Sequence, residues 1–255
     1  MQLTTRRLIR AVQRATLWQR IVCGIWLFVF LLLVFMLAYP ICHRPGQLFI
    51  VIAIPLLWLS AIFLCRKRQM ILFHLLLYGI AIAFFLCLPG RRPDPGRLRN
   101  FYVGSLLGFE GTGYLWGGEN CFGVDCAGLV RRGLINAHFE LGLRTLNPQA
   151  IRTAFSLWWH GCSAEALRDE YRGITCPLFQ AESINAISCD HIKPGDIAVT
   201  LDGIHVLAYL GQDEWIEADP GLLRVVKLGV PNDNPWFNES VLVMRWASLC
   251  TVMPR

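Results

Sequence analysis

Three long runs of apolar residues dominate the first third of the chain. Residues 21–39, 48–65 and 71–88 contain no charged side chain, and His74 is the main polar interruption. An apolar helix of about 17–25 residues crosses a hydrocarbon core of about 30 Å. None of the runs has the polar face expected of a helix on a soluble domain. The pattern therefore predicts three transmembrane helices within residues 21–88; the alternative is two spans with one re-entrant or interfacial segment.

Basic residues near the ends of these runs predict their orientation. Eight arginines and lysines lie in residues 1–20 and 66–68, whereas Arg44 and the four arginines of residues 91–99 make five on the other side. Because positively charged loops are retained on the cytoplasmic side, we expect residues 1–20 to be a basic cytosolic segment. Three spans then place the C-terminal part outside the cytoplasm. The net charge of +6 comes largely from these flanks and does not indicate a nucleic-acid partner.

The composition changes after the third run. Residues 89–100, PGRRPDPGRLRN, are rich in proline, glycine and arginine, a composition that does not continue a helix. We expect them to form a linker between the membrane region, residues 21–88, and a domain over residues 101–255. This last part has ordinary polar content and is long enough for one compact domain.

Within the domain, the hydrophobic period shifts from helical to alternating along the chain. The expected helices cover residues 124–141, 147–159 and 163–171. The dipeptide Asp202-Gly203 between two apolar segments predicts a β-hairpin. Further strands are expected over residues 215–218, 222–228 and 241–246. Helices followed by antiparallel strands indicate an α+β domain.

Two cysteines stand close together where the first of these helices begins. Cys126 lies at the start of the helical pattern, and Cys121 lies in the glycine-bounded turn 117–123. Unpaired N–H groups at a helix start stabilise a thiolate, and the Cys126 N–H is also placed to stabilise an oxyanion. A metal site is not expected, because no second close ligand pair accompanies the two cysteines. We expect Cys126 to be a nucleophile without metal or cofactor, while Cys121 remains a candidate for a disulfide.

A thiol nucleophile needs a base, and His205 is the best placed of the domain's histidines. It begins the second half of the predicted hairpin, and the chain returns through Glu217 and Asp219 on the following strand. A carboxylate there holds one imidazole nitrogen while the other faces Cys126, as in a catalytic triad. Glu217 is the preferred third member, and Asp219 is kept in reserve.

Four short segments, in this order, resemble the NlpC-type, papain-like cysteine peptidases of bacterial cell walls. They are Tyr114-Leu115-Trp116-Gly117-Gly118, Asp125-Cys126-Ala127-Gly128-Leu129, Pro194-Gly195-Asp196 and His205-Val206. The resemblance covers residues from about 110 to 220. It implies a papain-like α+β domain in which an N-terminal helix bearing the nucleophile packs on an antiparallel sheet.

The resemblance also implies roles for individual residues. Cys126 corresponds to the nucleophile, His205 to the base and Glu217 to the third member. The residues implied to bind substrate are Tyr114, Trp116 and Asp125, the last at the free amino end of a stem peptide. Two positions depart from the family: Glu217 stands where histidine, asparagine or glutamine is usual, and Ala127 replaces a serine.

The expected protein is therefore an integral protein of the bacterial inner membrane, with its catalytic domain facing the periplasm or the cell exterior. Its expected substrate is the peptidoglycan stem peptide, cleaved at an amide bond by Cys–His catalysis. Two alternatives stay open. One is an acyltransferase or amidase that uses the same cysteine and histidine on a lipid or amine. The other is a membrane-anchored binding protein that keeps the fold without turnover.

Overall fold

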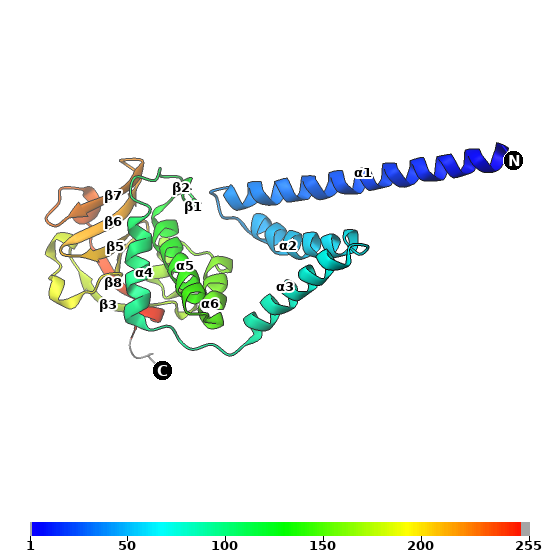
Figure 1. Ribbon diagram of the computed structural model, residues 1–255. Coiled ribbons are helices and arrows are strands. Elements are labelled where there is room, and N and C mark those ends of the chain that lie inside the picture. The colour runs from blue at the N-terminus through cyan, green and yellow to red at the C-terminus, as the bar shows by residue number, and fades with distance from the viewer. Residues whose placement is uncertain (1, 251–255) are drawn as a thin grey trace. The chain divides into compact units, whose positions relative to one another are not determined.

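The computed structural model describes residues 2–250 and divides the chain into two compact units (Figure 1). The first unit contains the chain up to Tyr39 together with His43–Ile80. The second contains Pro40–Cys42 and the chain from Ala81 onward.

Three helices cover the predicted membrane region. They are α1 (Gln2–Ala38), α2 (Arg44–Leu64) and α3 (Gln69–Cys87). Each contains a stretch that is long and apolar enough to cross a membrane. Most of their large apolar side chains are exposed, which is rare on soluble proteins and expected where lipid is the solvent. The three apolar runs are therefore confirmed as helices suited to membrane association.

The expected linker is wrong in its second half, because helix α4 (Pro95–Leu107) begins inside it. The Asp94 side chain caps this helix by accepting a hydrogen bond from the Arg97 N–H at 2.8 Å. Proline is favoured in the first turn of a helix, where its missing N–H costs nothing. Leu98, Tyr102 and Leu106 are fully buried in the core of the second unit. The irregular segment is therefore confined to residues 89–94.

The second unit is α+β, as predicted. Its remaining helices are α5 (Cys126–Arg144), α6 (Pro148–Trp159) and the short α7 (Ala164–Arg168). A small hairpin pairs β1 (Glu119–Asn120) with β2 (Gly123–Val124). An antiparallel sheet has the order β3-β8-β4-β5-β6-β7. Its strands are β3 (Thr175–Ala181), β4 (Ile197–Thr200), β5 (Val206–Gly211), β6 (Glu214–Asp219), β7 (Arg224–Gly229) and β8 (Val241–Trp246).

Both faces of the sheet are covered. Figure 1 shows α4, α5 and α6 gathered beside the sheet, and the apolar side of α5 packs against alternate residues of β4, β5 and β6. A second cluster, which includes Tyr209, Trp215 and Phe237, fills the opposite face. Since side chains alternate along a strand, Glu217 lies on the same face of β6 as Trp215.

The structure confirms the predicted hairpin, in which β4 pairs with β5 around Asp202-Gly203. It corrects the third predicted helix, which ends at Arg168 rather than continuing to residue 171. Glu170 and Arg172 adopt left-handed backbone conformations, with φ of 54° and 56°, and these do not continue a helix. Strand β3 was not predicted, because it is an edge strand with a register shift between Pro177 and Phe179 and lacks clean alternation.

Candidate active site

Cys126 is the first residue of helix α5, and a network of backbone hydrogen bonds holds it there. The Asp125 carboxylate caps the helix: Oδ1 accepts from the Gly128 N–H at 2.6 Å, and Oδ2 accepts from the Gly117 N–H at 2.8 Å. The Asp125 N–H donates to the Gly118 carbonyl at 3.1 Å. The glycine turn and the helix start are thereby joined around one carboxylate, and Cys126 is only 7% exposed.

Gly128 is required by the close approach of two backbone segments. A Cβ atom added there would lie 2.1 Å from the Gly118 carbonyl oxygen, far inside van der Waals contact. This contact explains why a glycine stands two residues after the cysteine, and it makes the helix start a rigid platform for the thiol.

The start of α5 also supplies favourable electrostatics. Among the described residues, the N–H groups of Cys126 and Ala127 have no backbone acceptor. Such groups carry the positive end of the helix dipole and stabilise a nearby anion. The Cys126 Sγ lies 3.8 Å from the Ile204 carbonyl oxygen, which brings the thiol next to the β4–β5 turn. Cys121, in contrast, is an exposed free cysteine in the turn of the β1–β2 hairpin.

The turn between β4 and β5 sets the position of His205. The Asp202 carboxylate accepts from the Thr200 hydroxyl at 2.6 Å and from the Ile204 N–H at 2.9 Å. The same hydroxyl accepts from the His205 N–H at 3.0 Å. Gly203 has φ of 76°, a conformation that glycine adopts at no steric cost. The Asp-Gly turn thus places a buried imidazole directly before β5.

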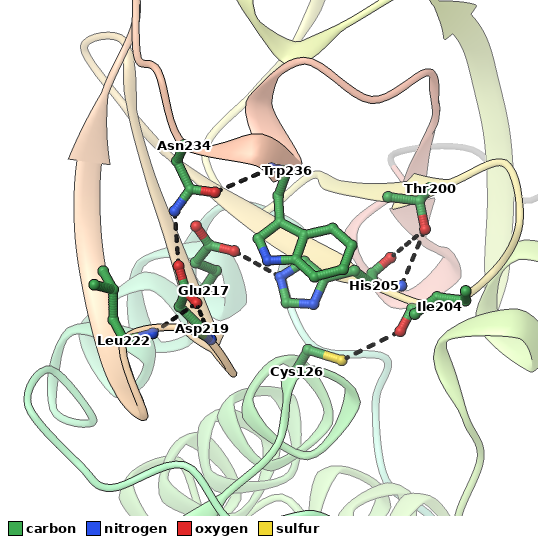
Figure 2. Close-up of polar contacts among 10 residues, drawn as sticks. Cys126, Thr200, Ile204, His205, Glu217, Asp219, Leu222, Asn234 and Trp236 are labelled. Carbon is green, nitrogen blue, oxygen red and sulfur yellow. Dashed lines mark hydrogen bonds and ion pairs between the residues drawn. The ribbon is translucent and has the colours of Figure 1, made fainter.

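Glu217 holds one side of that imidazole. Its Oε2 lies 2.6 Å from His205 Nε2, and both side chains are almost fully buried. Figure 2 shows the ring between the Glu217 carboxylate and Cys126, with its second nitrogen on the side of Cys126. Burial alone would lower the pKa of His205, but hydrogen bonds with Cys126 and Glu217 outweigh burial and raise this pKa to about 9.

Asp219, the reserve candidate, makes a different set of contacts. Its Oδ1 accepts from the N–H groups of Gly221 and Leu222 at 2.6 and 3.0 Å. Its Oδ2 accepts from the Asn234 side-chain amide at 2.7 Å. Asp219 therefore organises the loops beside the site, whereas Glu217 contacts the imidazole.

Trp236 is part of the site and was not predicted from the sequence. Its ring stacks on His205, with centroids 4.2 Å apart and planes inclined by 17°. It lies in the short turn Pro235–Phe237, which Asn234 caps by accepting from the Trp236 N–H at 3.0 Å. The local signal for this turn is the Asn-Pro pair, but that signal says nothing of the distant histidine.

Residues 111–245 match the sequence profile of the NlpC/P60 family, which is more than half of the chain. The chain belongs to the NlpC/P60 family. The resemblance seen in the four segments is therefore confirmed, and with it the papain-like α+β class of the domain. No curated protein matches the chain.

Solved structures of the same family are similar to part of the chain. The P60 domain of an antigen from M. avium subspecies paratuberculosis is 18% identical; the match covers 59% of this chain and 96% of that one, with a TM-score of 0.37. The peptidoglycan hydrolase RipB from Mycobacterium tuberculosis is 18% identical, with coverages of 61% and 67% and a TM-score of 0.39. An NlpC/P60 family protein from Bacillus cereus is 17% identical, with coverages of 61% and 40% and a TM-score of 0.37.

The three residues that the resemblance implies to bind substrate occupy three different environments in this NlpC/P60 domain. Tyr114 lies near the thiol: burial, followed by the negative charges of Cys126 and Asp125, raises the pKa of its phenol to about 12. Trp116 is 78% exposed, beside Gly117 in the turn before β1. Asp125 is mainly occupied with the two backbone N–H groups that it caps.

The remaining family segment, Pro194-Gly195-Asp196, has a structural role. Asp196 is fully buried, and its carboxylate forms two hydrogen bonds with the Arg245 guanidinium at 2.7 and 2.6 Å. It also accepts from the Lys193 N–H at 2.8 Å. The segment therefore ties the start of β4 to β8 and does not contact Cys126 or His205.

Two other histidines of the domain, His138 and His160, lack these contacts with a carboxylate and a cysteine. His138 is buried in α5 with both ring nitrogens lacking a described partner, and burial lowers its pKa to about 4. His160 lies at the end of α6, where its Nδ1 is 2.8 Å from the Ser156 carbonyl oxygen. Among the side chains that the structure describes, no group of three or more histidine, cysteine or acidic residues is arranged to hold a metal ion.

Proposed function

We propose that this chain is a membrane-anchored cysteine peptidase that cleaves amide bonds in the stem peptides of peptidoglycan. Membership of the NlpC/P60 family supports hydrolysis of cell-wall peptides. The observation that carries the proposal is the alignment of three side chains: Cys126 at a helix start, His205 beside it and Glu217 at 2.6 Å from the far imidazole nitrogen. Those are the parts of a nucleophile, a base and an orienting group.

In the proposed mechanism, His205 Nδ1 takes the thiol proton of Cys126 while its Nε2–H donates to Glu217. The thiolate attacks the carbonyl carbon of the scissile amide, and the Cys126 N–H stabilises the oxyanion. The C–N bond then breaks as His205 returns the proton to the leaving amine. Water, activated by His205, attacks the resulting thioester and releases the acid and the free thiol.

The surroundings of His205 favour its protonated form around neutral pH. The pKa of His205, raised to about 9, lies above the usual value of about 6.5. The contribution of the imidazolium to stability is therefore fully present below pH of about 6.5 and is lost as pH rises through about 9. The imidazolium that forms when His205 takes the thiol proton is consequently favoured over the neutral range.

The proposed substrate contacts lie around the start of α5. Tyr114 is proposed to line the cleft next to Cys126, and Trp116 to offer an exposed aromatic face to the substrate. Asp125 is proposed to bind the amino end of the stem peptide through lone pairs that its two backbone partners leave free. Ala127 adds no hydroxyl there, so this recognition rests on the carboxylate alone.

Mass spectrometry of peptidoglycan fragments tests the proposal. The purified full-length protein should convert stem peptides into two shorter peptides by adding one water, and Cys126→Ala should abolish this conversion. Cys121→Ala is the matched control, and it should keep wild-type turnover because that thiol is exposed on the β1–β2 turn. Transfer of the acyl group to an added amine or lipid without hydrolysis would contradict peptidase activity and support an acyltransferase.

We further propose that the three apolar helices cross the bacterial inner membrane with the N-terminus in the cytosol. The excess of basic residues in positions 1–20 and 66–68 supports this orientation. A reporter active only outside the cytoplasm should be active when fused to the C-terminus. A cytosolic reporter that is active at the same fusion point, with the first reporter silent, would reverse the orientation.

A further inference from the structure

The imidazole of His205 needs more than one contact to keep its orientation. Its hydrogen bond to Glu217 restrains one ring nitrogen, but a single bond along the ring edge leaves rotation about that bond open. A base works only when its lone pair points at the proton that it accepts. The ring face must therefore also be restrained, and the group that contacts this face is Trp236.

Trp236 is held over the ring by a short chain of hydrogen bonds. Asp219 Oδ2 accepts from the Asn234 side-chain amide at 2.7 Å, and Asn234 Oδ1 accepts from the backbone N–H of Trp236 at 3.0 Å. Figure 2 shows this chain running from Asp219 through Asn234 to the backbone N–H of Trp236, whose indole lies over His205. Asp219 itself is fixed by two backbone N–H groups. The tryptophan is thus anchored by rigid groups rather than by loop packing alone.

The anchor and the orienting carboxylate come from one strand. Glu217 and Asp219 both belong to β6, two residues apart, and so lie on the same face. Glu217 contacts the edge of the imidazole, while Asp219 controls its face through Asn234 and Trp236. Any movement of β6 relative to His205 changes both restraints together.

The indole also keeps water from the His205–Glu217 bond. Among the described residues, Glu217 Oε1 is buried without a hydrogen-bond partner. A hydrogen bond between buried groups is stronger when water does not compete for it. A stacked ring at 4.2 Å leaves no space for a water molecule on that face.

We propose that Trp236 is a positioning residue for His205 and that Asp219 and Asn234 act through it. This inference rests on the proposed function, because a positioning role is defined by its effect on turnover. The contacts that support it are those of Trp236 with the Cys126–His205–Glu217 group. Trp236 is not proposed to contact the scissile bond.

The first test compares turnover of stem peptides by Trp236→Ala, Trp236→Phe and the wild type. A base whose ring is misaligned loses rate without losing substrate affinity. We expect kcat of Trp236→Ala to fall by roughly tenfold to a hundredfold with KM within about threefold of wild type. Trp236→Phe, which keeps a flat ring, should recover most of the loss. Trp158→Ala, on the outer helix α6, is the matched control and should change neither constant.

The second test asks whether Asn234 acts through Trp236. Asn234→Ala should lower kcat about three- to tenfold in the wild-type background and by less than about twofold in Trp236→Ala, because effects that share one route are not additive. Full additivity of the two substitutions would overturn the proposed chain. An increase in KM alone would also overturn it, since this would make Trp236 a substrate contact.

A third measurement separates this inference from the proposed function. The rate at which iodoacetamide alkylates Cys126, followed by peptide mapping over a range of pH, reports on the Cys–His pair without any peptide substrate. If the wild-type thiol reacts no faster than Cys121, the proposed function fails. If it reacts faster, and neither the rate nor its pH profile changes in Trp236→Ala, the positioning role fails. Should Trp236→Ala unfold, Trp236→Phe and Asn234→Ala provide the same comparison.

Discussion

Replacing His205 with alanine should abolish hydrolysis of stem peptides. The side chain is 2% exposed, hydrogen-bonded to Glu217 and adjacent to Cys126, so no described neighbour is placed to take over its proton transfers. Its loss should be as severe as that of Cys126, and the double variant should be no worse than either single one, because the two residues act as a unit. Fragment release measured by mass spectrometry checks this. Near-normal turnover by His205→Ala would place the base elsewhere.

The third member of this group should show a graded response. Glu217→Ala should lower kcat by roughly tenfold to a thousandfold, since the ring loses the acceptor that selects its tautomer. Glu217→Gln should be milder, because an amide oxygen still accepts from the imidazole. Asp219→Ala should cost less than Glu217→Ala, since its carboxylate reaches His205 only through Asn234 and Trp236. If Glu217→Ala kept the wild-type kcat and Asp219→Ala lost most of it, the third member would be Asp219 rather than Glu217.

The second large effect should be on stability rather than on chemistry. Asp196→Ala removes a fully buried carboxylate and leaves the Arg245 guanidinium without its two hydrogen bonds. Removing one partner of a fully buried pair costs about 3–5 kcal/mol, and since the Arg245 side chain is 16% exposed we expect a loss at or below the lower end of that range. The thermal unfolding midpoint of the full-length protein, followed by near-ultraviolet circular dichroism, should therefore fall by many degrees.

An exposed pair of the same chemical type provides the control for that experiment. Asp169 and Arg168 are hydrogen-bonded at 2.8 Å at the surface, where screening by solvent leaves an ion pair with little effect on stability. Asp169→Ala should therefore leave the unfolding midpoint almost unchanged. Equal shifts for Asp196→Ala and Asp169→Ala would show that the Asp196–Arg245 pair does not hold β4 to β8.

Local chemistry explains why much of the domain was predictable. The Asp202-Gly203 turn forms a hairpin because Gly203 adopts a positive φ and Asp202 accepts nearby hydrogen bonds. Cys126 begins a helix because Asp125, directly before it, caps the first turn. The start of helix α4 is ambiguous in the sequence because a proline, which breaks a helix in its interior, directly follows an aspartate that caps one.

The sequence by itself determined the apolar helices, the α+β class and the identity of Cys126, His205 and Glu217 as candidates, because these depend on period, turn chemistry and spacing along a strand. The tertiary structure alone decided between Glu217 and Asp219 as the contact of the imidazole, since both lie on one face of β6. It alone placed Trp236 on His205, because His205 and Asp219, which holds the loop through Asn234, are both distant from Trp236 in the chain. Contacts of this kind depend on how strands and loops meet in space, and no local pattern encodes that meeting.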